Sequence, residues 1–221
     1  VDDEPDLRET LYQRPLAGGT FVLADESQSG FRMFNTLDDE TLDIAVNWNL
    51  FSSLAGRPTL YKFGPNYVHR TRDFASRRFR FIPTNFRSVN LSQAPEVLFA
   101  SENIGVDFRF NEETRPVDAY DADQRLTAFY GMADMALTGR ARLVAGVRVE
   151  RFDLEVNTFD PFGLFLGQIQ AKLDDTDWFP GINFVYSLRP DMNLRFGFSQ
   201  TVNRPEFREL AAFEFTDVVG N

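Results

Sequence analysis

Apolar and polar residues alternate one by one along much of the chain, which is the pattern of a β-strand with two unlike faces. In Thr41–Leu50 the apolar side chains occupy the even positions, and polar or small residues occupy the odd ones. The alternation recurs in later segments, at about 59–81, 118–132, 140–150, 177–188 and 193–203. A weaker strand is expected near Leu7–Tyr12, whereas a helical period fits poorly. The pattern therefore predicts an all-β protein.

The connections between these segments alternate between short and long. Short ones are expected at Phe51–Pro58, Thr138-Gly139 and Arg189–Met192, and long ones at Gln13–Asp39, Thr84–Val117 and Phe159–Lys172. A sheet with one trimmed and one elaborated end is typical of transmembrane barrels. The fold predicted is an antiparallel up-and-down meander, a partial transmembrane β-barrel with about seven strands of a larger barrel.

The two tight hairpins give a test of register. A two-residue turn at Thr138-Gly139 would put Leu137 opposite Arg140, and so Tyr130 opposite Val147. The hairpin around Pro190-Asp191 joins two strands that are both apolar on even positions, and it therefore needs a loop of odd length. We predict that the two hairpins differ in parity.

Alternation alone does not separate a membrane barrel from a soluble β-sandwich, because both have one apolar face. The segments are longer than the five to six residues of an ordinary strand. Aromatic residues lie near strand ends, as in the aromatic girdles of barrels, at Trp48, Tyr61, Tyr120, Trp178 and Tyr186. These features favour the barrel.

Composition removes several classes of function. The 221 residues carry a formal charge of −10, which argues against a nucleic-acid partner. With no cysteine and one histidine, disulfides, thiolate chemistry and multi-histidine metal sites are excluded. No apolar run is long enough for a transmembrane helix. We find no catalytic constellation and expect neither an enzyme nor a cofactor or metal.

One strand and its following loop are crowded with arginines, namely Arg70, Arg72, Arg77, Arg78, Arg80 and Arg87. They could form an electropositive surface for an anionic ligand, for which Arg70, Arg72, Arg78 and Arg80 are the candidates. Alternatively, Arg78 and Arg80 could form cross-strand ion pairs with Asp118, Asp121 and Asp123. The acidic clusters at 2–6, 38–40 and 174–177 are expected on a solvated rim.

The second half of the chain resembles the β-barrel of TonB-dependent outer-membrane receptors. The segments that carry the resemblance are 118–152 and 175–215, with GVRVE, DWFPGINFVYSL and LRFGFSQTVNRPEFREL in the order and spacing of that family. The last motif is the specific one, and it is expected to end a strand at the rim, through Arg204, Pro205, Glu206, Phe207, Arg208, Glu209 and Leu210. Ala212 departs from the proline that often follows in the family.

The resemblance implies a barrel of about 22 strands around an N-terminal plug in the bacterial outer membrane. Such receptors take up a scarce ligand (siderophore, vitamin or carbohydrate) with energy from the TonB complex. Residues 1–221 are expected to be a single partial barrel domain, without the plug or the C-terminal strands. Its partners would be outer-membrane lipid, the rest of its barrel and plug, TonB through the plug, and a small ligand. A porin-like barrel and a soluble carbohydrate-binding β-sandwich remain alternatives.

Overall fold

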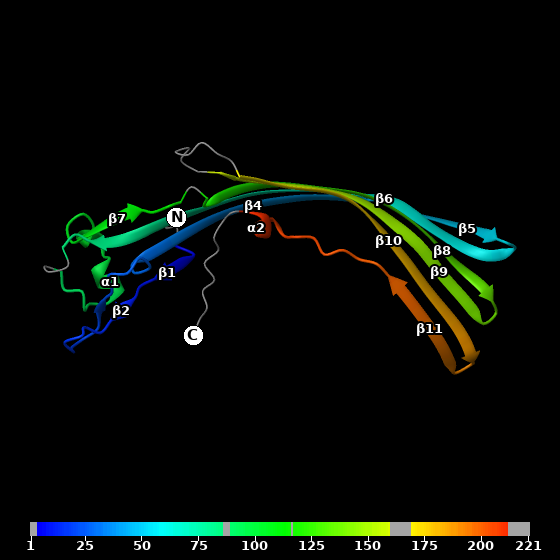
Figure 1. The fold of residues 1–221 in the computed structure, drawn as a ribbon, viewed down its shortest axis with the longest axis horizontal. Coiled ribbons are helices and arrows are strands. Elements are labelled where there is room, and N and C mark those ends of the chain that lie inside the picture. The colour runs from blue at the N-terminus through cyan, green and yellow to red at the C-terminus, as the bar shows by residue number, and fades with distance from the viewer. Residues whose placement is uncertain (1–3, 86–88, 116, 160–168, 212–221) are drawn as a thin grey trace.

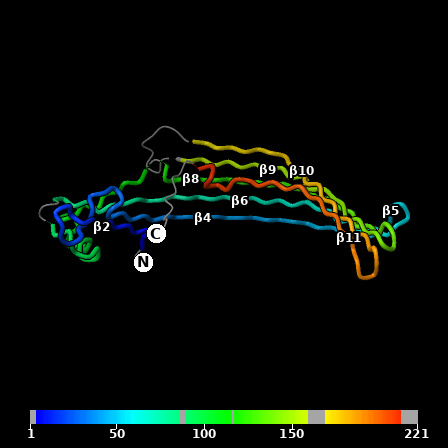
Figure 2. Tube along the Cα trace, turned by 60° about the horizontal axis from the view of Figure 1, so that its bottom comes forward, coloured from blue at the N-terminus to red at the C-terminus, as the bar shows by residue number. Residues whose placement is uncertain are grey.

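The computed structural model describes residues 4–85, 89–115, 117–159 and 169–211. In these residues nine strands form one antiparallel sheet with the central order β1-β4-β6-β8-β9-β10-β11, and β5 and β7 also pair with β6. The strands are β1 (Leu7–Glu9), β4 (Phe31–Ala45), β5 (Trp48–Leu54), β6 (Arg57–Pro83), β7 (Phe108–Glu112), β8 (Ala119–Thr138), β9 (Ala141–Phe159), β10 (Ile169–Arg189) and β11 (Met192–Ser199). The predicted antiparallel meander is confirmed, and within the described residues it forms an open arched sheet (Figures 1 and 2).

The smaller elements gather at the long-loop end or lie beneath the sheet. A separate hairpin pairs β2 (Tyr12–Gln13) with β3 (Val22–Leu23). The long loop between β6 and β8 contains a short helix, α1 (Pro95–Leu98), followed by a 3-10 turn at Ser101–Asn103. A second helical turn, α2 (Phe207–Leu210), lies under the arch (Figure 1).

Short and long connections are segregated to opposite ends of the sheet, as predicted (Figure 1). Two of the predicted connections were too long, however. The first hairpin turns on Ala55 and Gly56 alone, both with positive φ, as the tight turns of hairpins require. The connection predicted to reach Asp39 ends earlier, because β4 already begins at Phe31.

The predicted strand Thr41–Leu50 is divided between β4 and β5 at Val46-Asn47. Pairing with β6 keeps the same register on both sides of the break, which lies opposite Gly64-Pro65. The amide of Val46 donates to the carbonyl of Pro65 at 3.1 Å, and proline has no N–H to return. A missing donor therefore interrupts the ladder without changing which residues face which side.

The predicted register of the β8–β9 hairpin was wrong by one residue. Tyr130 lies opposite Arg148, not Val147, and the register shifts between Ala136 and Thr138. The irregularity at Leu137 reverses the parity that a regular hairpin would have.

The β10–β11 hairpin has the same form. It turns on Pro190-Asp191, and its register shifts between Ser187 and Arg189. Even positions pair with even ones, as predicted, but the parity difference between the two hairpins is wrong, since both contain a bulge beside a two-residue turn.

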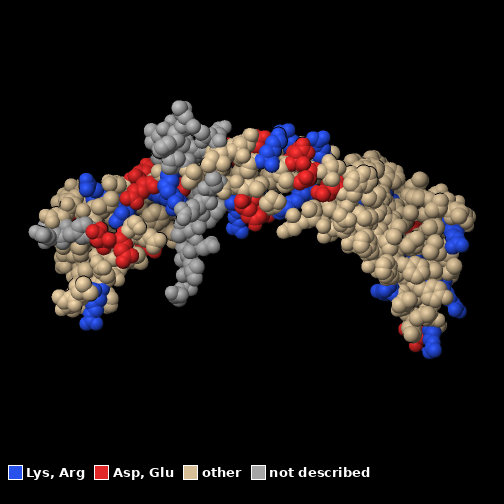
Figure 3. Space-filling view, viewed as in Figure 1, with Lys and Arg blue, Asp and Glu red and all other residues tan. Residues whose placement is uncertain are grey.

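One face of the sheet, here called the outer face, is apolar in the half that carries the short turns. Its exposed side chains alternate in register across neighbouring strands and form what we call the apolar band: Leu42, Ile44, Trp48, Leu50, Tyr67, Phe129, Val147, Trp178, Ile182, Leu194, Phe196 and Phe198. In the space-filling view most of this half is uncharged, and its visible charged atoms lie mainly toward the end that carries the short turns (Figure 3). Trp48, Tyr61, Trp178 and Tyr186 share this face, as predicted.

Toward the long loops the two faces exchange character. There the outer face carries rows of polar residues, such as His69, Arg125, Asp153 and Asp174, which are cross-strand neighbours. The inner face, under the arch, becomes apolar and includes Tyr120, which was wrongly predicted for the outer girdle and is 2% exposed.

The acidic clusters at 38–40 and 174–177 lie within β4 and β10 and not on a rim loop as expected. Of the first cluster, residues 2 and 3 lie outside the described residues.

Candidate functional site

The inner face of the short-turn half is a network of charged and amide side chains. Arg148 donates to Glu150 at 2.6 Å and to the side-chain oxygen of Asn66 at 3.1 Å. Nearer the turns, Arg142 holds Asp134 through two hydrogen bonds of 2.8 and 2.5 Å. Glu150 is thus neutralised by a guanidinium of its own strand and Asp134 by one of the neighbouring strand, so the face is polar and its charges are paired.

The motif at 204–210 does not end a strand at the rim, contrary to the prediction. We call the nine-stranded sheet the wall. Its last strand, β11, ends at Ser199, and just beyond it the amide of Gln200 donates to the carbonyl of Pro180 at 3.2 Å. Beyond Gln200 the chain leaves the wall and crosses the inner face, where Arg204 contacts Glu150 and Asp177 and where Pro205, which cannot donate to a ladder, is tolerated. We call residues 200–211 the inner strap.

Arg204 fixes the start of the inner strap to two strands. Its guanidinium donates to Glu150 of β9 at 2.6 Å and to Asp177 of β10 at 2.8 Å. The same group lies 4.4 Å from the ring centroid of Phe152. Glu150 is 9% exposed and bound by two arginines, so removing Arg204 would leave a buried charge less compensated.

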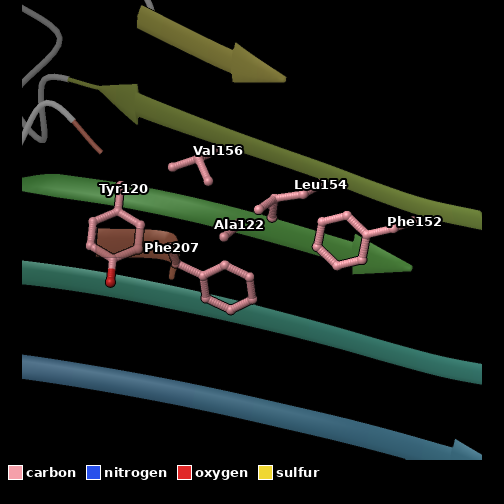
Figure 4. Packing of buried hydrophobic residues seen from close by; sticks show 6 residues of the cluster. All are labelled: Tyr120, Ala122, Phe152, Leu154, Val156 and Phe207. Carbon is pink, nitrogen blue, oxygen red and sulfur yellow. The ribbon is translucent and has the colours of Figure 1, made fainter. Parts of the chain in front are cut away.

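Phe207 anchors the other end of the strap in an apolar patch. Its side chain is 2% exposed and packs with Tyr120, Ala122, Phe152, Leu154 and Val156 of β8 and β9 (Figure 4). A capping box closes the helical turn, in which Glu206 and Glu209 each accept from the other's backbone amide. The patch explains why the inner face turns apolar where no lipid could cover it.

Arg70 and Arg72, two of the predicted ligand residues, lie beside this strap. Both donate to Asp39 on β4, and their guanidinium carbons lie 4.9 and 5.1 Å from the ring centroid of Phe207. Hydrogen bonding from Arg70 lowers the pKa of Asp39, which lies outside the apolar band, to about 2. Their charges are engaged within the protein, and a role in ligand binding stays a prediction.

Arg78 and Arg80 serve the long-loop end. Arg78 pairs with the fully buried Asp118 at 2.8 Å, as the cross-strand alternative predicted. The predicted ion pair of Arg80 with Asp121 or Asp123 was wrong. Arg80 lies 3.8 Å from Glu113 and donates to backbone carbonyls of 26 and 29.

Asp123 and Arg77 have other partners, both on the outer face. Asp123 binds His69 at 2.8 Å on the outer face, and Arg77 binds Glu112 there at 2.9 Å. Arg87 lies outside the described residues. The arginine-rich strand is therefore divided between two faces and several partners and forms no single patch.

Sequence reasoning missed Glu150 and Asp177 as partners of Arg204. They lie 54 and 27 residues away along the chain, and only the pairing of β9 with β10 brings them together. The isolated arginine before Pro205 was the only sequence signal of this contact.

Two features are absent from the described residues, a metal-binding cluster and a membrane-spanning helix. No group of three or more histidine, cysteine or acidic side chains there is arranged to hold a metal ion. No helix among them is long and apolar enough to cross a membrane.

Comparison with known proteins agrees with the fold. The family model described as TonB dependent receptor-like, beta-barrel matches residues 5–221. No curated protein matches the chain. The match covers both the sheet and the inner strap.

Proposed function

The chain belongs to the TonB dependent receptor-like β-barrel family, and we propose that it forms wall strands of a receptor for the energised uptake of a scarce ligand. Receptors of this family lie in the bacterial outer membrane. The proposed ligand is a siderophore, a vitamin or a carbohydrate. The proposed partners are the plug of the same receptor, TonB acting through it, and lipid around the wall.

The observation that carries this proposal is the two-sided wall. The outer face presents an apolar band, and the inner face behind it carries ion pairs and amides. From Trp178 to Tyr186 a strand rises about 26 Å at about 3.3 Å per residue. A tilt of about 40° reduces this to about 20 Å, close to the roughly 25 Å apolar belt of outer-membrane barrels.

The sidedness can be tested at two adjacent positions. Ile182 lies at the middle of the apolar band, and Asn183 faces inward. Ile182→Arg should cost about 2–4 kcal/mol of barrel stability in a bilayer, whereas Asn183→Arg should cost much less. Urea unfolding of the intact protein in lipid vesicles measures both. Equal effects at the two positions would contradict the lipid assignment.

Uptake itself is tested in cells that carry or lack the gene, each with and without TonB. The probes are a radiolabelled ferric chelate, cobalamin and a maltodextrin. Accumulation of one probe only when both the gene and TonB are present supports the proposal. Passage that is independent of TonB would favour a porin-like barrel. Partition of the protein into the aqueous phase after detergent extraction would favour a soluble β-sandwich.

A further inference from the structure

Two arginines lie directly opposite each other at the long-loop end of the sheet. Arg8 of β1 and Arg32 of β4 are cross-strand partners in the antiparallel register, and these strands run side by side (Figure 1). Like charges in this position destabilise a sheet unless something between them compensates.

The protein supplies little of that compensation. The guanidinium of Arg32 is half-buried, and its hydrogen bond among the described residues goes to the carbonyl of Phe31 at 2.6 Å. Arg8 approaches Glu4 at 3.6 Å, but both side chains are largely exposed, so water screens this pair. Burial, followed by the charge of Arg8, lowers the pKa of Arg32, and the nearby charge of Glu96 offsets only part of this. A bound anion would relieve both effects.

Aromatic rings lie against the buried cation. The rings of Phe81 and Phe99 stack with their centroids 4.4 Å apart, and the guanidinium carbon of Arg32 lies 5.4 and 5.3 Å from them. These rings, the two arginines, Thr10, Pro95 and Glu96 line a groove of about 340 Å³. This volume is within the range of small-molecule sites.

We propose that this groove binds a small organic anion, whose carboxylate or phosphate group lies between Arg8 and Arg32 and whose planar part packs against Phe99, which is less buried than Phe81. Guanidinium groups bind both oxyanions through paired hydrogen bonds, which explains the choice of arginine. Glu96 is the one acidic group lining the groove. It opposes the anion and so limits the affinity.

The test is equilibrium binding to the intact protein in detergent, by calorimetry, with phenyl phosphate, inorganic phosphate and phenol as probes. Phenyl phosphate should bind more tightly than inorganic phosphate, and phenol should show no binding. Arg32→Gln should weaken phenyl phosphate at least tenfold, the effect expected for lost charge-assisted hydrogen bonds. Glu96→Gln should strengthen it. Arg57→Gln, an exposed change at the opposite end of β6, is the matched control.

Arg8→Gln keeps the test decisive if Arg32 variants fail to fold. Because Arg8 is exposed and faces a like charge, this variant should unfold at a slightly higher temperature without ligand, yet lose the stabilisation that phenyl phosphate gives the wild type. Binding that is absent in the wild type, unchanged by Arg8→Gln, or weakened by Glu96→Gln would overturn the inference. The binding assay uses no energy source, so its failure and a failure of TonB-dependent uptake are separate results.

Discussion

Phe207→Ala should release the inner strap while leaving the wall folded. The side chain is 2% exposed and fills the patch formed by Phe152, Leu154 and Val156. Truncating a buried phenylalanine in a core costs about 3–5 kcal/mol. The two guanidinium contacts to the ring add to this by about 0.5–1 kcal/mol each. The helical turn around Phe207 takes no part in strand pairing, and the other anchor of the strap, Arg204, lies before it, so the cost falls on local opening of this turn and not on global unfolding.

Hydrogen exchange of the intact protein in detergent reports this opening. The amides of Glu209 and Ala211, which bond to the carbonyls of Glu206 and Phe207, should exchange faster in the variant. At about 1.4 kcal/mol per factor of ten, the expected increase is about 100-fold or more, up to the unprotected rate. Amides in β8 and β9 should keep their protection.

Arg208→Ala is the matched control, because Arg208 is exposed on the same helical turn. It should change the exchange of these amides by less than about threefold, since surface substitutions are usually within about 0.5 kcal/mol. If Phe207→Ala accelerates exchange no more than Arg208→Ala, the apolar patch does not hold the strap. If protection in the wall is lost as well, the strap is part of one cooperative unit with it.

Three further substitutions test the wall and its inner face. Gly64→Ala would place a Cβ 1.8 Å from the carbonyl oxygen of Val46, so we expect little folded barrel on heat-modifiability gels, whereas Gly131→Ala, with open space, should fold normally. Arg204→Gln should cost about 3–5 kcal/mol in urea unfolding, because it breaks a partly buried charge network; a loss below about 1 kcal/mol would contradict this. The pKa of Asp39, lowered to about 2, means that its stabilisation is present above the ordinary value of about 3.9 and is lost as the pH falls through about 2. Asp39→Asn should therefore reduce stability at pH 7 and flatten its dependence on pH between 4 and 2, and equal acid profiles for variant and wild type would refute the assignment.

The sequence alone was sufficient for the class of fold and for the segregation of short and long connections. Period-2 alternation follows directly from the geometry of a strand, in which neighbouring side chains point to opposite faces. The length of each connection is a local property of its turn residues.

The tertiary structure decided which face each residue occupies. The bulge at Leu137 shifts the register by one residue and so reverses the predicted pairing of β8 with β9, whereas the bulge at Leu188 gives the parity that was predicted for β10 and β11. Alternation could not reveal that the inner face becomes apolar under α2, because the partner of that face, Phe207, lies far along the chain.

The arginines show the same limit at the level of the site. Sequence could identify the crowding from Arg70 to Arg80, but each side chain's partner depends on strand pairing and on the long loop. The opposed pair of Arg8 and Arg32 had no sequence signal, because the two residues are 24 positions apart along the chain and only the register brings their strands together. Local chemistry determines strands and turns, whereas the encounter of distant charges is determined only when those strands pair.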